Sequence, residues 1–222
     1  MLYSCYNTAQ NGGDFDSVFA MVKYRFDSII AGLGLSLDLS AEYEHIKWAI
    51  LHHAGRDYAA SRGEYLNGMI LAEYLGYDFI DPADYIKFCD DGSFDAETTN
   101  GILSEEMKKH ENGVIPGFYG SHPNGTIRTF SRGGSDITGS IVARAVYADL
   151  YENWTDVNGF LMADPRIVPG AKTIKYITYR ELRELSYMGA TVLHEDAIFP
   201  VRFAGIPVNI RNTNDVSDSG TM

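Results

Sequence analysis

The sequence predicts an α/β protein with a mostly parallel sheet covered by helices on both faces. Helical patterns open the chain, short apolar segments bounded by glycine or proline follow, and strand-like and helix-like segments alternate after residue 131. Parallel strands need a long crossover connection, usually a helix, so this alternation favours a parallel sheet. With 222 residues, 45% of them hydrophobic, the chain can bury the core of one large domain.

Three amphipathic helices are expected in the first 76 residues. The first covers 14–33, where apolar residues recur three or four positions apart. The second covers 41–55 after Ser40, which suits the N-cap because its hydroxyl can accept a backbone N–H. The third covers 58–75 and is expected to end at Gly76, since glycine readily adopts the left-handed conformation of a helix C-terminus.

The middle of the chain is expected to hold short strands and loops. Proline and glycine punctuate it, and such residues end strands and form turns. We expect extended segments at 77–82, 85–88 and 114–120, a loop at 90–99, a short surface helix at 102–110, and a hairpin or loop at 121–125.

The last part of the chain carries the alternation that predicts the parallel sheet. We expect a turn at 131–136 that begins a helix reaching Leu150, a strand at 151–157, a helix at 178–188 and a strand at 207–211. The polar residues 213–222 resemble the beginning of a linker.

Composition excludes several function classes. The net charge of -12 argues against non-specific binding to nucleic acid or anionic membranes, which both require a basic surface. Cys5 and Cys89 are too few for a disulfide framework, and no signal peptide opens the chain. No apolar run reaches the ~20 residues that span a bilayer. We therefore expect a cytoplasmic protein that binds neither nucleic acid nor membrane.

The segment 129–136 is the strongest indication of a ligand site. Arg132 can form two parallel hydrogen bonds to a carboxylate, and Asp136 can hold an ammonium group. Between them, Gly133 and Gly134 allow backbone amides to approach a ligand closely, and Ser135 adds a hydroxyl. The pattern indicates a site for a small zwitterion such as an amino acid. A structural ion pair between Arg132 and Asp136 is the alternative interpretation.

Glu64 is a second candidate, in the sequence Ser-Arg-Gly-Glu at 61–64. We expect it near the start of the third helix, where the helix dipole would keep its carboxylate ionised. Helix capping is the alternative role.

A third candidate segment follows the strand predicted at 151–157. Thr155 and Asp156 lead into a glycine turn, and open parallel sheets bind nucleotides beyond the carboxyl ends of their strands. Arg166 can reach phosphate oxygens, although the adjoining Asp164-Pro165 pair is also consistent with a simple turn.

Other motifs favour no further chemistry. His194 is interpreted as a structural histidine, and no Cys/His set has the spacing of a zinc site. The Gly-x-Ser-x-Gly elbow of serine hydrolases and the Walker lysine motif of P-loop kinases are both absent from the sequence.

Taken together, these segments resemble the aspartate kinases of the amino-acid kinase superfamily. The chain has Arg-Gly-Gly-Ser-Asp at 132–136 after Gly-Phe-Tyr-Gly at 117–120, and the family's Ser-x-Gly-Glu at 61–64. The remaining motifs are Thr-Asp-Val-x-Gly at 155–159, Ala-Asp-Pro-Arg-x-Val-Pro at 163–169, Tyr-x-Glu at 179–181, Gly-Ala-x-Val-Leu-His at 189–194, Ile-Pro-x-x-x-x-Asn-Thr at 206–213 and Gly-Thr at 220–221. Their order and spacing agree across nearly the whole chain.

The resemblance implies a three-layer α/β/α sandwich and transfer of the ATP γ-phosphoryl group to the side-chain carboxylate of L-aspartate. The product, 4-phospho-L-aspartate, begins the biosynthesis of lysine, methionine and threonine. By the family pattern, Arg132 would bind the substrate α-carboxylate. The α-ammonium group would be bound by Glu64, Ser135 and Asp136, with Gly133 and Gly134 beside them. ATP would be bound by Thr155, Asp156 and Arg166.

The resemblance also implies that Mg²⁺ bridges the ATP phosphates, with no metal ligand assigned to the protein, and that the protein is a homo-oligomer. Two positions depart from the family pattern. Leu161 stands where the family often has an aromatic residue, and Thr191 stands where it has a lysine. Neither is assigned a nucleotide contact.

The ends of the chain depart further from the family. The Lys-Phe-Gly-Gly motif of the family's first strand is absent, and the ACT regulatory domains do not follow residue 221. We therefore expect residues 1–222 to form a partial catalytic domain that lacks the first strands. Its parts would be a helical segment (1–76), substrate-side strands and loops (77–130), and a nucleotide-binding segment (131–222).

Because the missing lysine neutralises the transferred group, we expect little kinase activity from these 222 residues alone. One alternative is a non-catalytic remnant that only binds aspartate or nucleotide. Another is a superfamily member acting on glutamate, uridylate or carbamate, against which the intact 132–136 motif and Glu64 argue.

Overall fold

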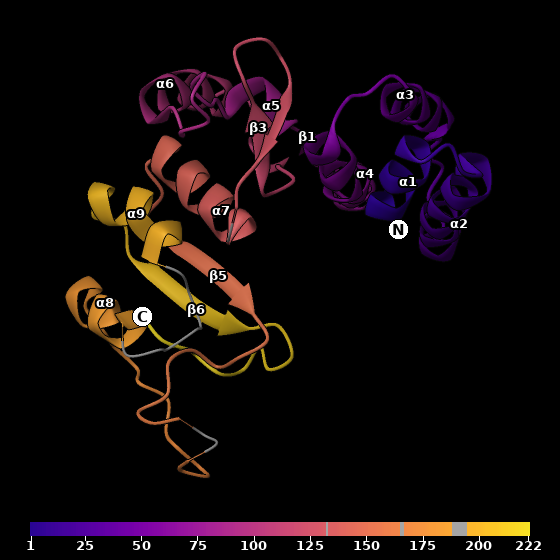
Figure 1. The fold of residues 1–222 in the computed structure, drawn as a ribbon. Helices are drawn as coiled ribbons and strands as arrows, with labels where there is room; N and C mark the ends of the chain where they lie inside the picture. The colour runs from indigo at the N-terminus through magenta and orange to yellow at the C-terminus, as the bar shows by residue number, and fades with distance from the viewer. Residues whose placement is uncertain (132, 165–166, 188–194) are drawn as a thin grey trace. The chain divides into compact units, whose positions relative to one another are not determined.

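The computed structural model describes residues 1–131, 133–164, 167–187 and 195–222, which form two compact units, 1–130 and 131–222 (Figure 1). Its helices are α1 (Leu2–Gln10), α2 (Phe15–Leu33), α3 (Ser40–Leu51), α4 (Arg56–Leu75), α5 (Pro82–Tyr85), α6 (Ala96–Met107), α7 (Gly134–Ala145), α8 (Tyr179–Tyr187) and α9 (Glu195–Ala204). Its strands are β1 (Asp78–Phe79), β2 (Gly113–Val114), β3 (Tyr119–Ser121), β4 (Ile127–Thr129), β5 (Tyr151–Thr155) and β6 (Val208–Asn212).

The helices and the parallel strand pairs confirm the predicted α/β class. No helix within the described ranges is long and apolar enough to cross a membrane.

Four helices, rather than the three predicted, open the first unit. The Asp14 side chain accepts the Ser17 N–H at 3.1 Å and caps α2, and α4 ends at Gly76, whose φ of 68° is left-handed. Ser40 is the first residue of α3 rather than its N-cap, and its own N–H bonds to Asp38 at 2.9 Å. The missed helix, α1, is only nine residues long and lies at the start of the sequence.

The four helices share one hydrophobic core. Their apolar faces bury Tyr43, Ile46 and Leu66, each at most 1% exposed. The Tyr43 hydroxyl still finds a partner, because it donates to the Asp27 carboxylate at 2.9 Å. The predicted helical periodicity is therefore the physical basis of this part of the fold.

The remainder of the first unit contains short strands between short helices. Strands β1 and β2 pair in parallel, whereas β3 and β4 form the hairpin predicted around 121–125. The single strand predicted at 114–120 is interrupted near Pro116, which cannot donate to a strand ladder. Helix α6 begins inside the predicted loop because Asp95 accepts the Thr98 N–H at 3.0 Å and caps it. The segment predicted to be extended at 85–88 begins as the end of α5.

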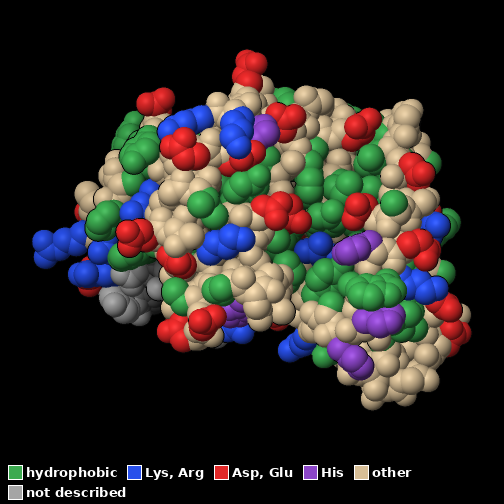
Figure 2. All heavy atoms as spheres, turned by 90° about the horizontal axis from the view of Figure 1, so that it is seen from above, with side chains coloured by type: hydrophobic (Ala, Val, Ile, Leu, Met, Phe, Trp, Pro, Cys, Tyr) green, Lys and Arg blue, Asp and Glu red, His purple; other side chains and the backbone are tan. Residues whose placement is uncertain are grey.

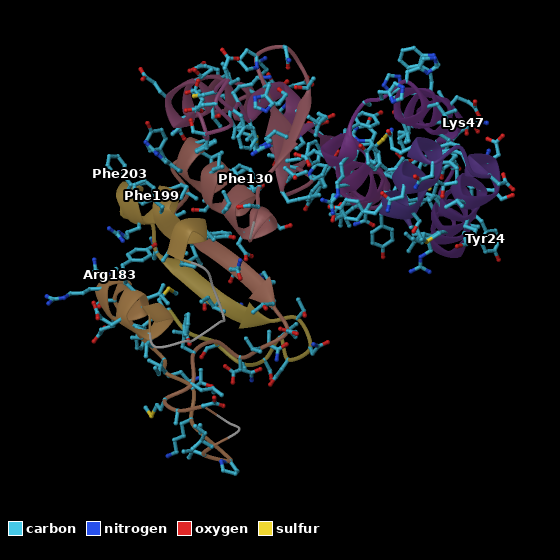
Figure 3. All side chains as sticks on the ribbon, in the orientation of Figure 1. Tyr24, Lys47, Phe130, Arg183, Phe199 and Phe203 are labelled. Carbon is cyan, nitrogen blue, oxygen red and sulfur yellow. The ribbon has the colours of Figure 1, made fainter. Side chains whose placement is uncertain are left out.

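The second unit is built on the parallel pair β5–β6. Helices α7 and α9 pack against each other on one side of this pair (Figure 1), and α7 ends at Ala145, earlier than the predicted Leu150. Helix α9 was not predicted from the sequence. It buries Ala197, Ile198 and Val201. On its outer face, Phe199 and Phe203 are 56% and 72% exposed (Figure 3).

The prediction of a linker at 213–222 is wrong, because the end of this segment packs into the second unit. Thr221 is 1% exposed and exchanges two backbone hydrogen bonds with Ile210 of β6, at 3.1 and 2.9 Å. Its hydroxyl accepts the Phe160 N–H at 2.9 Å and donates to the Ile174 carbonyl at 2.6 Å. Polar composition was misleading here because Thr221, although polar, is buried and makes its hydrogen bonds inside the protein, while residues 213–217 remain exposed.

Replacing Gly120 by Ala should destabilise the first unit. A Cβ atom at Gly120 would lie 2.3 Å from the Ile86 carbonyl oxygen in a buried strand, so the backbone must move. We expect a loss of about 2 to 3 kcal/mol in the free energy of unfolding, measured in urea. Gly101→Ala is the matched control, since nothing lies within 4 Å of its Cβ position in α6, and it should stabilise by roughly 0.5 to 1 kcal/mol. Similar effects of the two substitutions would contradict this packing.

Replacing Thr221 by Val should destabilise the second unit more than replacing it by Ser. Valine keeps the shape of the side chain but leaves the buried Phe160 N–H without its acceptor, at a cost of about 2 kcal/mol. Serine keeps the hydroxyl and loses only a methyl group, at a cost of about 1 kcal/mol. Thermal unfolding of both variants measures the difference. If the valine variant is the more stable one, the hydroxyl does not hold this segment.

Candidate functional site

The predicted glycine turn lies at the start of α7. Gly133 has φ 55° and ψ 28°, a left-handed conformation that glycine adopts without strain, and it occupies the N-cap of the helix. Its carbonyl oxygen accepts the Ile137 N–H at 2.8 Å, which closes the first turn of α7. Gly134, Ser135 and Asp136 form that turn, where free backbone N–H groups and the helix dipole favour an anion. Arg132 lies outside the described residues.

The Asp136 carboxylate is held by a residue that the sequence reading missed. The Asn153 side chain, on β5, donates from Nδ2 to Oδ1 of Asp136 at 2.8 Å. The same Nδ2 group lies 3.0 Å from the Tyr151 hydroxyl, which donates to the Asp136 carbonyl oxygen at 3.2 Å. Alternation along a strand places Tyr151 and Asn153 on one face of β5, and this period of two was the available signal.

Tyr151 fits beside α7 because Gly139 has no side chain. A Cβ atom at Gly139 would lie 2.6 Å from the Tyr151 hydroxyl oxygen. Burial raises the pKa of Tyr151 to about 12, and the nearby Asp136 charge acts in the same direction, against the Asn153 hydrogen bond. The phenol is therefore protonated and able to donate at neutral pH.

Thr155 and Asp156 lie where β5 ends. The Thr155 carbonyl oxygen accepts the backbone N–H of Thr213 at 2.8 Å and its hydroxyl at 3.0 Å, which ties this end of β5 to the end of β6. The Thr155 hydroxyl lies 3.3 Å from the Asp156 carboxylate, and Asp156 is exposed. Since β5 and β6 are parallel, both loops lie at the carboxyl edge of the pair, the edge at which open α/β sheets bind ligands.

The loop after Asp156 is braced by amide side chains. Asn158 accepts a hydrogen bond from Asn212 and donates to the Asp218 carboxylate at 3.2 Å. Gly159, at φ 96°, approaches Thr221 so closely that a Cβ atom would lie 2.2 Å from its hydroxyl oxygen. These contacts fix the backbone that presents Thr155 and Asp156.

The segment predicted to reach phosphate is described only in part. The Asp164 carbonyl oxygen accepts the N–H groups of Ile167 at 3.0 Å and Val168 at 2.8 Å. Arg166 lies outside the described residues, as do Thr191 and His194. Leu161 pairs with Thr173 in an isolated β-bridge.

Glu64 is not at a helix end, which corrects both interpretations of its position. It lies eight residues after Arg56, inside the 20-residue helix α4, where the terminal dipole does not act and no cap is needed. Partial burial of its carboxyl group raises the pKa of Glu64, although the residue as a whole is exposed. The acidic residue of the first turn is Asp57, which accepts the Thr129 N–H at 3.0 Å. Glu64 belongs to the first unit, and the other candidates belong to the second.

A buried arginine next to Gly63 was not identified from the sequence. Arg62 is 5% exposed and donates from Nε and Nη2 to the Ser61 hydroxyl at 3.1 and 2.9 Å. Three tyrosine rings surround its guanidinium group, with centroids 4.6, 4.4 and 5.2 Å away; they belong to Tyr58, Tyr65 and Tyr119. Cation–π contacts of this kind stabilise an arginine that has left water.

The second unit also contains a pocket of about 330 Å³ that is lined mostly by apolar groups. Its walls include Tyr179 and Leu182 of α8 and Val208 and Ile210 of β6. As far as the structure describes the chain, its lining includes no predicted site residue. In the same described part, no three His, Cys, Asp or Glu side chains form a group that could hold a metal.

Comparison with known proteins identifies the family. Residues 23–212 match the model of the amino acid kinase family. Aspartokinase 3 of Bacillus subtilis is 42% identical over 174 residues, which is 74% of this chain and 38% of the relative. The structure matches the aspartate kinase of Clostridium acetobutylicum with a TM-score of 0.94 and 56% identity, over 99% of this chain and 51% of the other.

A more distant structure shows the fold alone. Aspartokinase III of Escherichia coli, solved with aspartate and ADP, matches with a TM-score of 0.81 at 24% identity, over 99% of this chain and 55% of the other. The chain thus spans 38% of the length of the B. subtilis relative and about half of each matched structure. Sequence and fold together place the chain in the amino acid kinase family, in its aspartate kinase branch.

Proposed function

We propose that the protein acts as an aspartate kinase, which transfers the γ-phosphoryl group of ATP to the side-chain carboxylate of L-aspartate. The observation that carries this proposal is the Arg-Gly-Gly-Ser-Asp sequence at 132–136, whose last three residues form the first turn of α7, in a chain 56% identical to an aspartate kinase. Free L-aspartate offers one ammonium and two carboxylate groups, and this segment offers the complementary charges.

The reaction places its main demand on positioning and positive charge. The aspartate side chain has an unperturbed pKa of about 3.9, so it is ionised at neutral pH and needs no general base. The barrier comes largely from bringing one anion to another, and phosphoryl transfer is catalysed chiefly by positioning and electrostatic stabilisation. The protein itself has a net charge of -12, and basic and acidic side chains are interspersed over the face in Figure 2. Local cations must therefore favour the binding of both anions.

On the amino-acid side, Arg132 would bind the α-carboxylate through paired N–H groups. Asp136, Ser135 and Glu64 would hold the α-ammonium group, with the backbone at Gly133 and Gly134 close to the ligand. The hydrogen bond from Asn153 supports this role for Asp136, because it engages one carboxylate oxygen, and among the described residues no side chain donates to the other. The raised pKa of Glu64 reflects a partly desolvated carboxyl group, in which an ammonium partner is more strongly attracted than in water.

On the nucleotide side, Thr155, Asp156 and Arg166 would contact ATP. The position of Thr155 and Asp156 at the carboxyl edge of β5–β6 supports this assignment. Mg²⁺ held by the phosphate oxygens would offset their negative charge, because this ion is usually bound through substrate phosphates and one or two carboxylates.

We also infer a cytoplasmic homo-oligomer. The cysteines support the first part, since Cys5 and Cys89 are both free thiols, as expected in a reducing compartment. The exposed rings of Phe199 and Phe203 support the second, because they offer apolar surface that association would bury.

Replacing Arg132 by Ala should weaken aspartate binding by about 30-fold or more, since removing one partner of a charged pair costs about 2 to 5 kcal/mol. The Kd for Mg-ATP should change by less than about threefold, because the guanidinium group would contact the amino acid and not the nucleotide. Titration calorimetry of the 222-residue protein with L-aspartate, and separately with ATP and Mg²⁺, measures both values.

Arg183→Ala is the matched control for loss of one positive charge. Arg183 extends from α8 (Figure 3) and pairs with Glu184 at 3.3 Å, so neither Kd should change. Equal losses of aspartate and nucleotide affinity in the Arg132 variant would favour a different substrate within the superfamily. Failure of the unchanged protein to bind L-aspartate would contradict the proposal itself.

A further inference from the structure

We propose that Asn153 is a positioning residue that holds the Asp136 carboxylate in place for the α-ammonium group of the amino-acid substrate. This inference rests on the proposed function and extends it to a residue that does not itself touch the substrate. It assigns the recognition of the ammonium group to a pair of residues, one on helix α7 and one on strand β5.

The geometry forms a closed set of hydrogen bonds between the two elements. Asn153 donates one N–H to Oδ1 of Asp136 at 2.8 Å and the other to the Tyr151 hydroxyl at 3.0 Å. The Tyr151 hydroxyl in turn donates to the Asp136 carbonyl oxygen at 3.2 Å. Both the backbone carbonyl and the side chain of Asp136 are therefore hydrogen-bonded to residues of β5, which restricts the rotation of the Asp136 carboxylate.

The chemistry of asparagine suits this role. Its amide must point Nδ2 at Asp136, because the amide oxygen would face the carboxylate as a second acceptor and repel it. An amide is neutral, so the hydrogen bond orients the carboxylate without cancelling its charge. A lysine or arginine at this position would neutralise the group that has to attract the substrate ammonium.

The Asn153 amide is buried, whereas the Asp136 carboxylate that it holds is only partly buried. Asn153 is 7% exposed, whereas Asp136 is half-buried at the N-terminal turn of α7. The amide is thus shielded from competing water, while the carboxylate remains accessible to a small ligand. The tight fit of Tyr151 against Gly139 holds the third member of the set in position.

The alternative is that Asn153 only fastens β5 to α7. A structural tie would affect folding, or would weaken all ligands of the site to a similar degree. A positioning residue for Asp136 would affect specifically those ligands that carry an ammonium group. Succinate has the two carboxylates of aspartate without the ammonium group, so the ratio of the two affinities separates the two roles.

The test is titration calorimetry of the 222-residue protein with L-aspartate and with succinate, before and after Asn153→Leu. Leucine has a similar size but offers no hydrogen bond to Asp136. We expect the preference for aspartate over succinate to fall by about tenfold, as for loss of a hydrogen bond to a charged group. Succinate affinity should change by less than about twofold. In an Asp136→Asn background, the Asn153 substitution should have no further effect on the ratio.

Glu152→Gln is the control on the same strand, since its side chain points to the opposite face of β5 and should leave the ratio unchanged. If Asn153→Leu does not fold, Tyr151→Phe is the variant to measure, because it removes only the Tyr151 hydroxyl group that bonds to Asn153 and Asp136. It should lower the ratio of aspartate to succinate affinity by roughly threefold. An unchanged ratio in the folded variant would overturn the role of Asn153. Absence of aspartate binding in the unchanged protein would instead overturn the proposed function, and this inference with it.

Discussion

The hydrogen bond from Asn153 to Asp136 joins the central strand pair of the second unit to the helix that begins with the glycine turn. Strand β5 is positioned by pairing with its parallel partner β6, and the Asp136 carboxylate is positioned by its hydrogen bond to β5. A flexible turn rich in glycine would otherwise leave an acidic side chain free to rotate in water. The site therefore depends on a strand that contributes no ligand of its own to the amino acid.

The same strand ends in the loop proposed for the nucleotide. Thr155 is tied through its carbonyl oxygen to Thr213, and the loop behind it is braced through Asn158 and Gly159. The segment 213–222 also holds this loop, because Thr221 is hydrogen-bonded both to Ile210 of β6 and to Phe160, which follows Gly159. One parallel pair thus organises the two halves of the proposed chemistry, with the amino acid at the helix and the nucleotide at the strand end.

Local signals in the sequence predicted most helices and failed where tertiary contacts decide. Helices α2 and α4 were predictable because periodic apolar residues and a terminal glycine act within one segment. Helix α9 was missed because Pro200 interrupts its pattern, and its buried face is defined by packing against other elements, chiefly α7. The segment ending at Thr221 was misread as a linker because the partners of the Thr221 hydroxyl group lie 61 and 47 residues away in sequence.

The residues of the candidate site were likewise predictable where local motifs sufficed, and were missed where contacts between distant segments define them. Motif spacing predicted Asp136 in the turn that begins a helix and Asp156 after a strand, where the structure places both, but it placed Glu64 at a helix start although it lies inside α4. Asn153 was not identified because its role appears only when β5 is packed beside α7. The buried Arg62 was missed for a similar reason, since one of its three aromatic neighbours, Tyr119, comes from a distant strand.

The central claim is that the Asp136 carboxylate, oriented from β5, receives the ammonium group of an amino acid. A crystal structure of this protein with L-aspartate tests it most directly. The account predicts the α-nitrogen within about 3 Å of Oδ2 of Asp136, with the Asn153 bond to Oδ1 retained. An α-nitrogen held elsewhere, with Asp136 instead closed into an ion pair with Arg132, would contradict it.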